Sequence, residues 1–100
     1  MYGRIAKLTT QAGKGSEVAD LLVTTTQSLP GCLSYIVAVD AAEPDLLWVT
    51  EAWEDGQAHK ASLTLPSVQQ AIKKARPFIT GLETIAETVP AGGLGLRKPS

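Results

Sequence analysis

Apolar and polar positions follow two different periods along this chain, and the period changes near glycines and prolines. Residues 2–10, 32–40 and 46–53 are rich in β-branched, aromatic and aliphatic side chains, and this composition favours strands. Between residues 16 and 29 the apolar side chains recur at the spacing of one helical stripe. That segment therefore predicts a helix, with Ser16 as its N-cap.

The second half of the chain contains two shorter helical segments and a last strand. Residues 55–63 and 66–76 predict helices, since Asp55 is a suitable N-cap and Pro66 suits a first helical turn. Residues 81–89 alternate in polarity and predict the fourth strand. The order βαββαβ indicates an α+β, ferredoxin-like fold, in which an antiparallel four-stranded sheet carries the helices on one face.

Both faces of the second and third strand segments are apolar. Tyr35 and Val37 alternate with Ile36 in one segment, and Val49 alternates with Trp48 in the other. An antiparallel sheet with one face in water shows alternating polar positions, which this pattern lacks. Since the helices cover only one face, we expect a second copy of the chain to cover the other. The pattern therefore predicts a homodimer that packs through the sheet face.

The composition excludes several classes of protein. One hundred residues, with 44% apolar and 19% charged side chains, predict one globular domain over residues 1–90 and a glycine-rich, basic tail over residues 91–100. A net charge of −1 lacks the concentrated basic face that a nucleic-acid partner requires. No apolar run approaches the roughly 18 residues of a membrane helix, and no signal-peptide-like segment is visible. With Cys32 as the only cysteine, we expect a cytoplasmic protein without a disulfide, a Cys-cluster zinc site or a membrane partner.

Four local features together resemble the antibiotic biosynthesis monooxygenase (ABM) family. They are Ala12-Gly13-Lys14 before the first helix, residues 30–35 (PGCLSY), residues 51–55 (EAWED), and Pro66, thirteen residues after the tryptophan of that last segment. The resemblance covers about residues 3–90. It implies a dimeric α+β barrel with a pocket between the sheet and the helices. Members of the family include cofactor-free oxygenases of quinols or polycyclic anthrones, haem-degrading enzymes and isomerases, so the fold alone does not select the reaction.

One position departs from the family pattern. Family members often carry a histidine four residues before the proline, where this chain has Ser62, and its only histidine, His59, lies three residues earlier. Because residues three apart share a helix face, His59 could reach the same pocket, or it could face solvent. The haem-degrading members also use an asparagine on the first strand, and this chain contains none. We therefore expect no haem, no other cofactor and no metal.

The catalytic candidates are His59, Ser62 and Glu51. Histidine is the side chain that ordinarily exchanges protons near neutral pH, so His59 could deprotonate a phenol before electron transfer to dioxygen. Ser62 could hydrogen-bond a substrate hydroxyl or carbonyl, or be an ordinary helix residue. Glu51 shares a strand face with Trp53. It could be a pocket acid, or the structural hydrogen-bond partner of Tyr35.

The binding candidates are Trp53, Tyr35 and Phe78. The rigid ring of Trp53 suits a flat aromatic substrate, and it would serve equally as a core tryptophan. Arg4 and Arg76 could bind an anionic substrate or form surface ion pairs. The residues and the resemblance predict a cofactor-independent monooxygenase for a phenolic, quinol or anthrone-like substrate. The alternatives are an isomerase or other proton-transfer enzyme on the same scaffold, and a non-enzymatic dimer that binds a small ligand.

Overall fold

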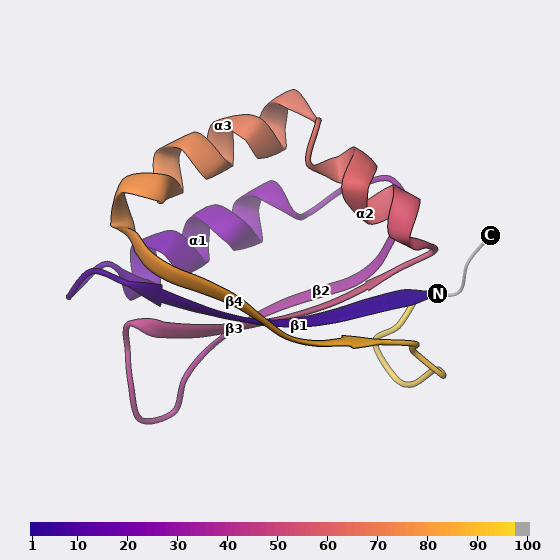
Figure 1. Ribbon diagram of the computed structural model, residues 1–100, viewed down its shortest axis with the longest axis horizontal. Coiled ribbons are helices and arrows are strands. Elements are labelled where there is room, and N and C mark those ends of the chain that lie inside the picture. Colours follow the sequence, from indigo (N-terminus) through magenta and orange to yellow (C-terminus); the bar gives the residue numbers. More distant parts are fainter. Residues whose placement is uncertain (98–100) are drawn as a thin grey trace.

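Four antiparallel strands form one sheet, in the order β2-β3-β1-β4, in the computed structural model, which describes residues 1–97 (Figure 1). The strands are β1 (Tyr2–Thr10), β2 (Cys32–Val39), β3 (Leu46–Trp53) and β4 (Ile79–Thr88). The helices are α1 (Gly15–Thr25), α2 (Gly56–Ser62) and α3 (Pro66–Ala75), and a short 3-10 turn, η1 (Arg76–Phe78), follows α3. All of these helices lie on one face of the sheet (Figure 1). The predicted ferredoxin-like order is confirmed, and the two helices predicted between the third and fourth strands are α2 and α3. None of the helices within residues 1–97 is long and apolar enough to span a membrane.

Helix α1 begins at Gly15 because a side chain from a distant loop holds its N-terminus. The Asp45 carboxylate, in the β2–β3 connection, accepts hydrogen bonds from the backbone N–H groups of Gly13 and Gly15, each at 3.1 Å. Gly15 has no room for a side chain, since a Cβ there would collide with the carbonyl oxygen of Pro44. The prediction of Ser16 as the N-cap is therefore wrong, because the N-cap position is Lys14, two residues earlier, and the capping oxygens come from Asp45.

The residues next to α2 and α3 in the sequence predict where these two helices begin, but the end of α1 was predicted less accurately. The Asp55 side chain accepts a hydrogen bond from the Ala58 backbone N–H at 2.7 Å, and Pro66 stands in the first turn of α3, as predicted. Helix α1 ends at Thr25 rather than near residue 29. The Thr25 hydroxyl donates to the carbonyl oxygen of Leu21, a bond within the helix that competes with continuation of its regular backbone ladder.

The core lies between the helices and the sheet face that they cover, called the inner face here. Leu8 from β1, Leu47 from β3 and Val18 from α1 are all buried in one apolar cluster. Trp53, at the end of β3, extends this buried layer toward α2, since its ring lies against His59.

The sheet register places three polar side chains in one row of the inner face. Arg4 of β1 pairs with Glu51 of β3, and Glu51 pairs in turn with Tyr35 of β2. Paired positions in an antiparallel sheet direct their side chains to the same face. The row Tyr35–Glu51–Arg4 therefore crosses three strands on the inner face of the sheet. It forms the polar part of the site described below.

The opposite, open face of the sheet is partly apolar. Ile36 is 57% exposed, and the alternation of β3 places Trp48 on the same face. The Trp48 indole N–H donates to the Asp40 carboxylate at 2.9 Å, and this hydrogen bond lowers the pKa of Asp40 below its usual value. No helix covers this face within the described residues (Figure 1).

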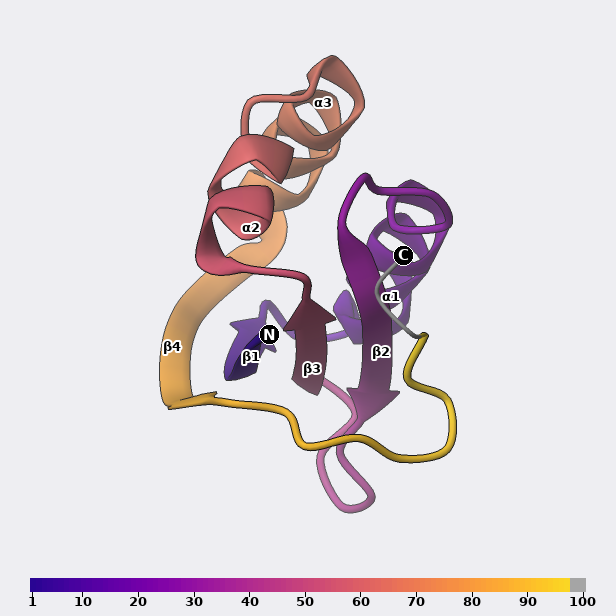
Figure 2. The same cartoon turned by 90° about the vertical axis from the view of Figure 1, so that its right-hand side faces the viewer.

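After β4 the chain returns past the end of the sheet to the opposite edge (Figure 2). The backbone N–H of Arg97 donates to the Leu33 carbonyl oxygen on β2 at 3.0 Å. The described part of the predicted tail is thus held against the same domain. Its last three residues, 98–100, lie outside the described residues.

Candidate functional site

A cavity of about 380 Å³ lies between the helices and the inner face of the sheet. Most of its lining is apolar and comes from β1, β3, α1 and α3. Its ionisable and hydroxyl-bearing members include Arg4, Tyr35, Glu51, His59, Ser62 and Arg76. Five of the six predicted site residues thus line one cavity, namely Tyr35, Glu51, Trp53, His59 and Ser62.

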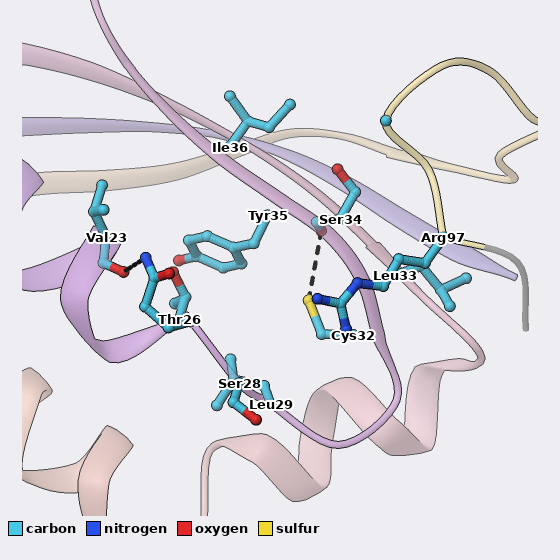
Figure 3. Close-up of a pocket in the computed structure, with 12 residues that line it drawn as sticks. Val23, Thr26, Ser28, Leu29, Cys32, Leu33, Ser34, Tyr35, Ile36 and Arg97 are labelled. Atoms are coloured by element: carbon cyan, nitrogen blue, oxygen red, sulfur yellow. Dashed lines mark hydrogen bonds between the residues drawn. The ribbon is translucent and has the colours of Figure 1, made fainter.

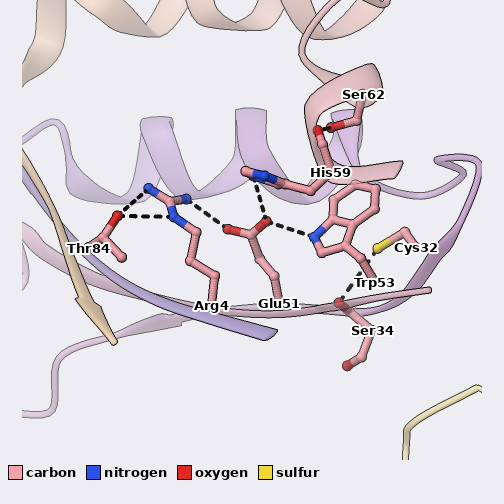
Figure 4. A network of polar contacts seen from close by, with 8 residues as sticks. All are labelled: Arg4, Cys32, Ser34, Glu51, Trp53, His59, Ser62 and Thr84. Carbon is pink, nitrogen blue, oxygen red and sulfur yellow. Dashed lines mark hydrogen bonds and ion pairs between the residues drawn. The ribbon is translucent and has the colours of Figure 1, made fainter. Parts of the chain in front are cut away.

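Glu51 lies at the centre of the polar end of this cavity and is only 5% exposed. Its Oε2 accepts a hydrogen bond from Arg4 Nη1 at 3.0 Å, and its Oε1 accepts one from the Trp53 indole Nε1 at 3.0 Å (Figure 4). His59 Nε2 lies 3.6 Å from the same Oε1. A buried carboxylate is stable only when it is paired and hydrogen-bonded, and these contacts meet that need.

Arg4 forms the other half of this ion pair and also reaches β4. Its Nε and Nη2 atoms donate to the hydroxyl oxygen of Thr84 at 3.1 and 3.0 Å. The guanidinium is thereby held between Glu51 on one neighbouring strand and Thr84 on the other (Figure 4). The sequence left open whether Arg4 binds an anionic substrate or forms a surface ion pair; the structure places it at the cavity, in an ion pair with the buried Glu51. The available signal was strand alternation, which puts Arg4 on the face of the buried Ala6 and Leu8.

The structure settles the direction of His59, which the sequence left open. The imidazole points from α2 toward the sheet (Figure 4), and its side chain is 17% exposed. Its ring centroid lies 5.5 Å from that of Trp53, in an edge-to-face arrangement, and 5.5 Å from that of Tyr2. His59 is therefore held between two aromatic rings beside the Glu51 carboxylate. Tyr2 had no place among the predicted site residues, because nothing in its local sequence indicates contact with α2.

Ser62 is buried at 5% exposure and lines the same cavity. Its hydroxyl donates to the backbone carbonyl oxygen of His59 at 2.6 Å. The hydrogen of the serine is therefore engaged within α2, and its oxygen remains an acceptor for a group in the cavity.

Tyr35 lines this cavity and also a second groove of about 320 Å³ (Figure 3). Burial raises the pKa of the Tyr35 phenol, and the nearby negative charge of Glu51 adds to the effect. The phenol therefore stays protonated and can donate a hydrogen bond at neutral pH. In the groove, burial also raises the pKa of the Cys32 thiol, which disfavours the reactive thiolate form.

Phe78 is the one predicted site residue that does not line the cavity. It packs against the apolar core cluster, and the Lys14 ammonium lies 4.9 Å from its ring centroid. The short turn η1 directs this ring toward α1 instead of the polar row.

Within residues 1–97, no group of three His, Cys, Asp or Glu side chains is arranged to hold a metal ion.

Comparison with known proteins places this geometry in a family. The family model of antibiotic biosynthesis monooxygenases matches residues 1–74. The chain belongs to the ABM family. The match includes five of the predicted site residues and ends before Phe78. No curated protein matches this ABM-family chain with significance.

Solved structures agree with the assignment of the chain to the ABM family. A protein of Chloroflexus aurantiacus that carries the family name is 49% identical, with a TM-score of 0.89 over 95% of this chain and 97% of that chain. One of Deinococcus radiodurans, also named for the family, is 28% identical, with a TM-score of 0.76 over 94% and 96% of the two chains. A Pseudomonas aeruginosa protein at 16% identity and a TM-score of 0.79, over 91% and 94%, shares the fold.

Proposed function

We propose that this chain is a cofactor-independent monooxygenase that oxidises a phenolic, quinol or anthrone-like aromatic substrate with dioxygen. One observation carries the proposal: an imidazole stands at the polar end of an apolar cavity, with His59 Nε2 3.6 Å from the buried Glu51 carboxylate. Membership of the ABM family supports the class of reaction.

The cavity suits a flat aromatic molecule. Its volume of about 380 Å³ falls within the range of small-molecule sites, which are mostly apolar with a few placed polar groups. Val49 on the sheet and Ile72 on α3 contribute to its apolar lining. Trp53, at 1% exposure, contributes to the wall and holds Glu51 through its indole N–H. A ring bound between these walls would bring a phenolic hydroxyl toward His59.

In this proposal His59 accepts the proton of the substrate hydroxyl. The imidazolium that forms would lie against Glu51 Oε1, since Arg4 occupies Oε2 of the same carboxylate. The substrate anion then gives one electron to dioxygen, and recombination of the two radicals joins oxygen to the ring carbon. For an anthrone, the methylene carbon becomes a carbonyl. One oxygen atom stays on that carbon and the other leaves as water, so the substrate supplies all the electrons.

Oxygen uptake by purified, metal-stripped protein tests the proposal against a panel of anthrones and quinols. We expect protein-dependent uptake with an equal amount of oxidised product, and a loss of kcat by about 10²-fold in His59→Gln. Lys60→Gln, an exposed neighbour on α2, serves as the matched control and should keep full activity.

Three outcomes would contradict the proposal. Uptake no greater than autoxidation, with substrates that bind, would exclude the monooxygenase. Conversion without oxygen consumption would instead favour the isomerase. Binding without any conversion would favour a small-ligand-binding protein.

We also propose that two copies of the chain pair through the open sheet face. The helices cover the inner face only, while Ile36 on the open face is 57% exposed (Figure 1). Sheet-to-sheet packing about a two-fold axis would bury this surface, because each copy presents the same apolar strip. The cavity would then lie on the outer side of each sheet and remain open to substrate.

A further inference from the structure

The cavity holds a second arginine that no carboxylate neutralises among the described residues. Arg76, directly after α3, lines the same cavity as Glu51 and is exposed. The ion pairs of residues 1–97 join Arg4 to Glu51, Lys14 to Glu17, and His59 to Glu51. Arg76 therefore adds to the cavity lining a cation that no carboxylate of residues 1–97 pairs with.

The charges of the cavity show what such a ligand should carry. Arg4 is matched by Glu51 at 3.0 Å, so the polar row contributes little net charge. Arg76 adds one positive charge that no other carboxylate of the cavity lining balances. A ligand with one negative charge balances that charge, and a guanidinium binds a carboxylate through two parallel hydrogen bonds.

Arg76 and His59 lie at opposite ends of the helical layer. His59 is on α2, whereas Arg76 follows the last residue of α3, and these two places are far apart in Figure 1. The ten residues of α3 span about 15 Å between them. A ligand that meets His59 with one end therefore points its other end toward Arg76.

Several residues of the lining are exposed, so the cavity is in contact with solvent. Leu82 of β4 is 60% exposed and Leu63 after α2 is 43% exposed, and both line the cavity. Arg76, at the other end of α3 from Leu63, is exposed as well. An anionic group beside Arg76 keeps contact with water while its ring system is buried, which avoids the cost of burying a charge.

We propose that Arg76 selects aromatic substrates that carry a carboxylate at the end distant from the oxidised ring. The proposal names the substrate class of the monooxygenase proposed above and rests on that use of the cavity. Arg76 acts as a specificity residue: it binds the distal group and takes no part in the proton or electron transfers at His59.

Binding of two product-like probes tests this without any turnover. Anthraquinone-2-carboxylate and anthraquinone-2-carboxamide share one ring system and differ in charge. We expect calorimetry to show about tenfold tighter binding of the carboxylate, equivalent to about 1.4 kcal/mol. Arg76→Gln should remove this preference and change the carboxamide affinity by less than about twofold. The preference should also shrink at high salt, because Arg76 is in contact with solvent.

Lys73→Gln is the matched control. Lys73 is an exposed cation in the last turn of α3 and does not line the cavity. It should keep the preference for the carboxylate. An equal loss in Lys73→Gln and Arg76→Gln would overturn the proposal, because a diffuse positive field would then explain the selectivity. Equal affinity of the native chain for the two probes, or binding of neither, would also overturn it.

These results are separable from the test of the proposed function. Oxygen uptake with neutral anthrones, without a carboxylate preference, would overturn the role of Arg76 alone. A carboxylate preference that depends on Arg76, without oxygen uptake on any substrate, would overturn the monooxygenase and retain the anion-binding residue.

Discussion

The Glu51 carboxylate is reached by side chains from three elements: Arg4 from β1, Trp53 from β3 and His59 from α2. Each contact compensates part of the cost of removing a charge from water. The same contacts fix the imidazole of His59 at the cavity. At the scale of single residues, the stability of the site and its proposed chemistry therefore both depend on the side chain of Glu51.

Replacing Glu51 by Gln should lower the free energy of unfolding by about 2 kcal/mol, because the guanidinium of Arg4 loses its charged partner in a part-buried place. Urea unfolding measures this. Glu17→Gln is the control, since the ion pair of Glu17 with Lys14 is exposed and should be worth less than about 1 kcal/mol. If Glu51→Gln and Glu17→Gln lower the free energy of unfolding equally, burial of the Arg4–Glu51 ion pair does not increase its contribution to stability.

Tyr35 should make the stability of the chain fall at high pH. Burial raises its pKa in the folded state, whereas the unfolded chain loses the proton near pH 10, about the usual value. Above that pH the unfolded state binds fewer protons than the folded state, so stability decreases as pH rises. Tyr35→Phe should lose less stability than the native chain as the pH rises above about 10 in urea titrations.

Tyr2 supplies the comparison for that experiment. Its pKa is raised as well, first by burial and then by the charge of Glu87. Tyr35→Phe should therefore still lose some stability at high pH, through Tyr2. Tyr2→Phe should still show the loss of stability that comes from Tyr35. If Tyr35→Phe and the native chain lose stability equally, the phenol of Tyr35 is not protected from water.

At the scale of elements, two of the helices beside the site, α1 and α2, begin at an end fixed by a carboxylate. Asp55 lies next to α2 in the sequence and caps the helix on which His59 stands. Asp45 lies in the β2–β3 connection and holds the start of α1 through two backbone N–H groups. The first cap is readable from local sequence and the second is not, because thirty residues separate Asp45 from Gly15.

Asp45→Ala should destabilise the chain by about 1–2 kcal/mol, since the variant leaves two N–H groups at the start of α1 without their acceptor. Thermal and urea unfolding both measure this loss. Asp20→Ala, at an exposed position within α1, should change stability by less than about 0.5 kcal/mol. A similar loss in Asp20→Ala would mean that the general charge of α1, rather than the cap, sets its stability.

At the scale of the whole molecule, the two faces of the sheet differ: the helices lie on one face (Figure 2), which also borders the cavity, and no helix covers the other within residues 1–97. Exposed apolar side chains on a sheet face favour association. The proposed dimer would cover the open face without closing the cavity.

Ile36→Glu should convert that dimer into monomers, because it places a charge at an exposed apolar position of the open face. Light scattering after size exclusion measures the mass. Val23→Glu on α1, where Val23 is 44% exposed, is the control and should leave the mass unchanged. A native chain that elutes with the mass of one copy would contradict the proposed dimer at once.

The alternation of residues along the chain determined much of this protein. It gave the order of elements and put Tyr35, Glu51 and Trp53 on one side of their strands, since strand parity is a property of neighbouring residues. Local chemistry also located the starts of α2 and α3 at Asp55 and Pro66.

Only the tertiary structure decided which of these residues meet. Arg4 lies 47 positions from Glu51 and 80 from Thr84, and sheet register alone brings them together. The rotation of α2 turned His59 toward Glu51, whereas the turn η1 directed Phe78 to another part of the core. The alternation of residues determines on which face of its strand or helix a side chain lies. The distance between side chains of different elements is set by tertiary packing, which depends on the whole chain.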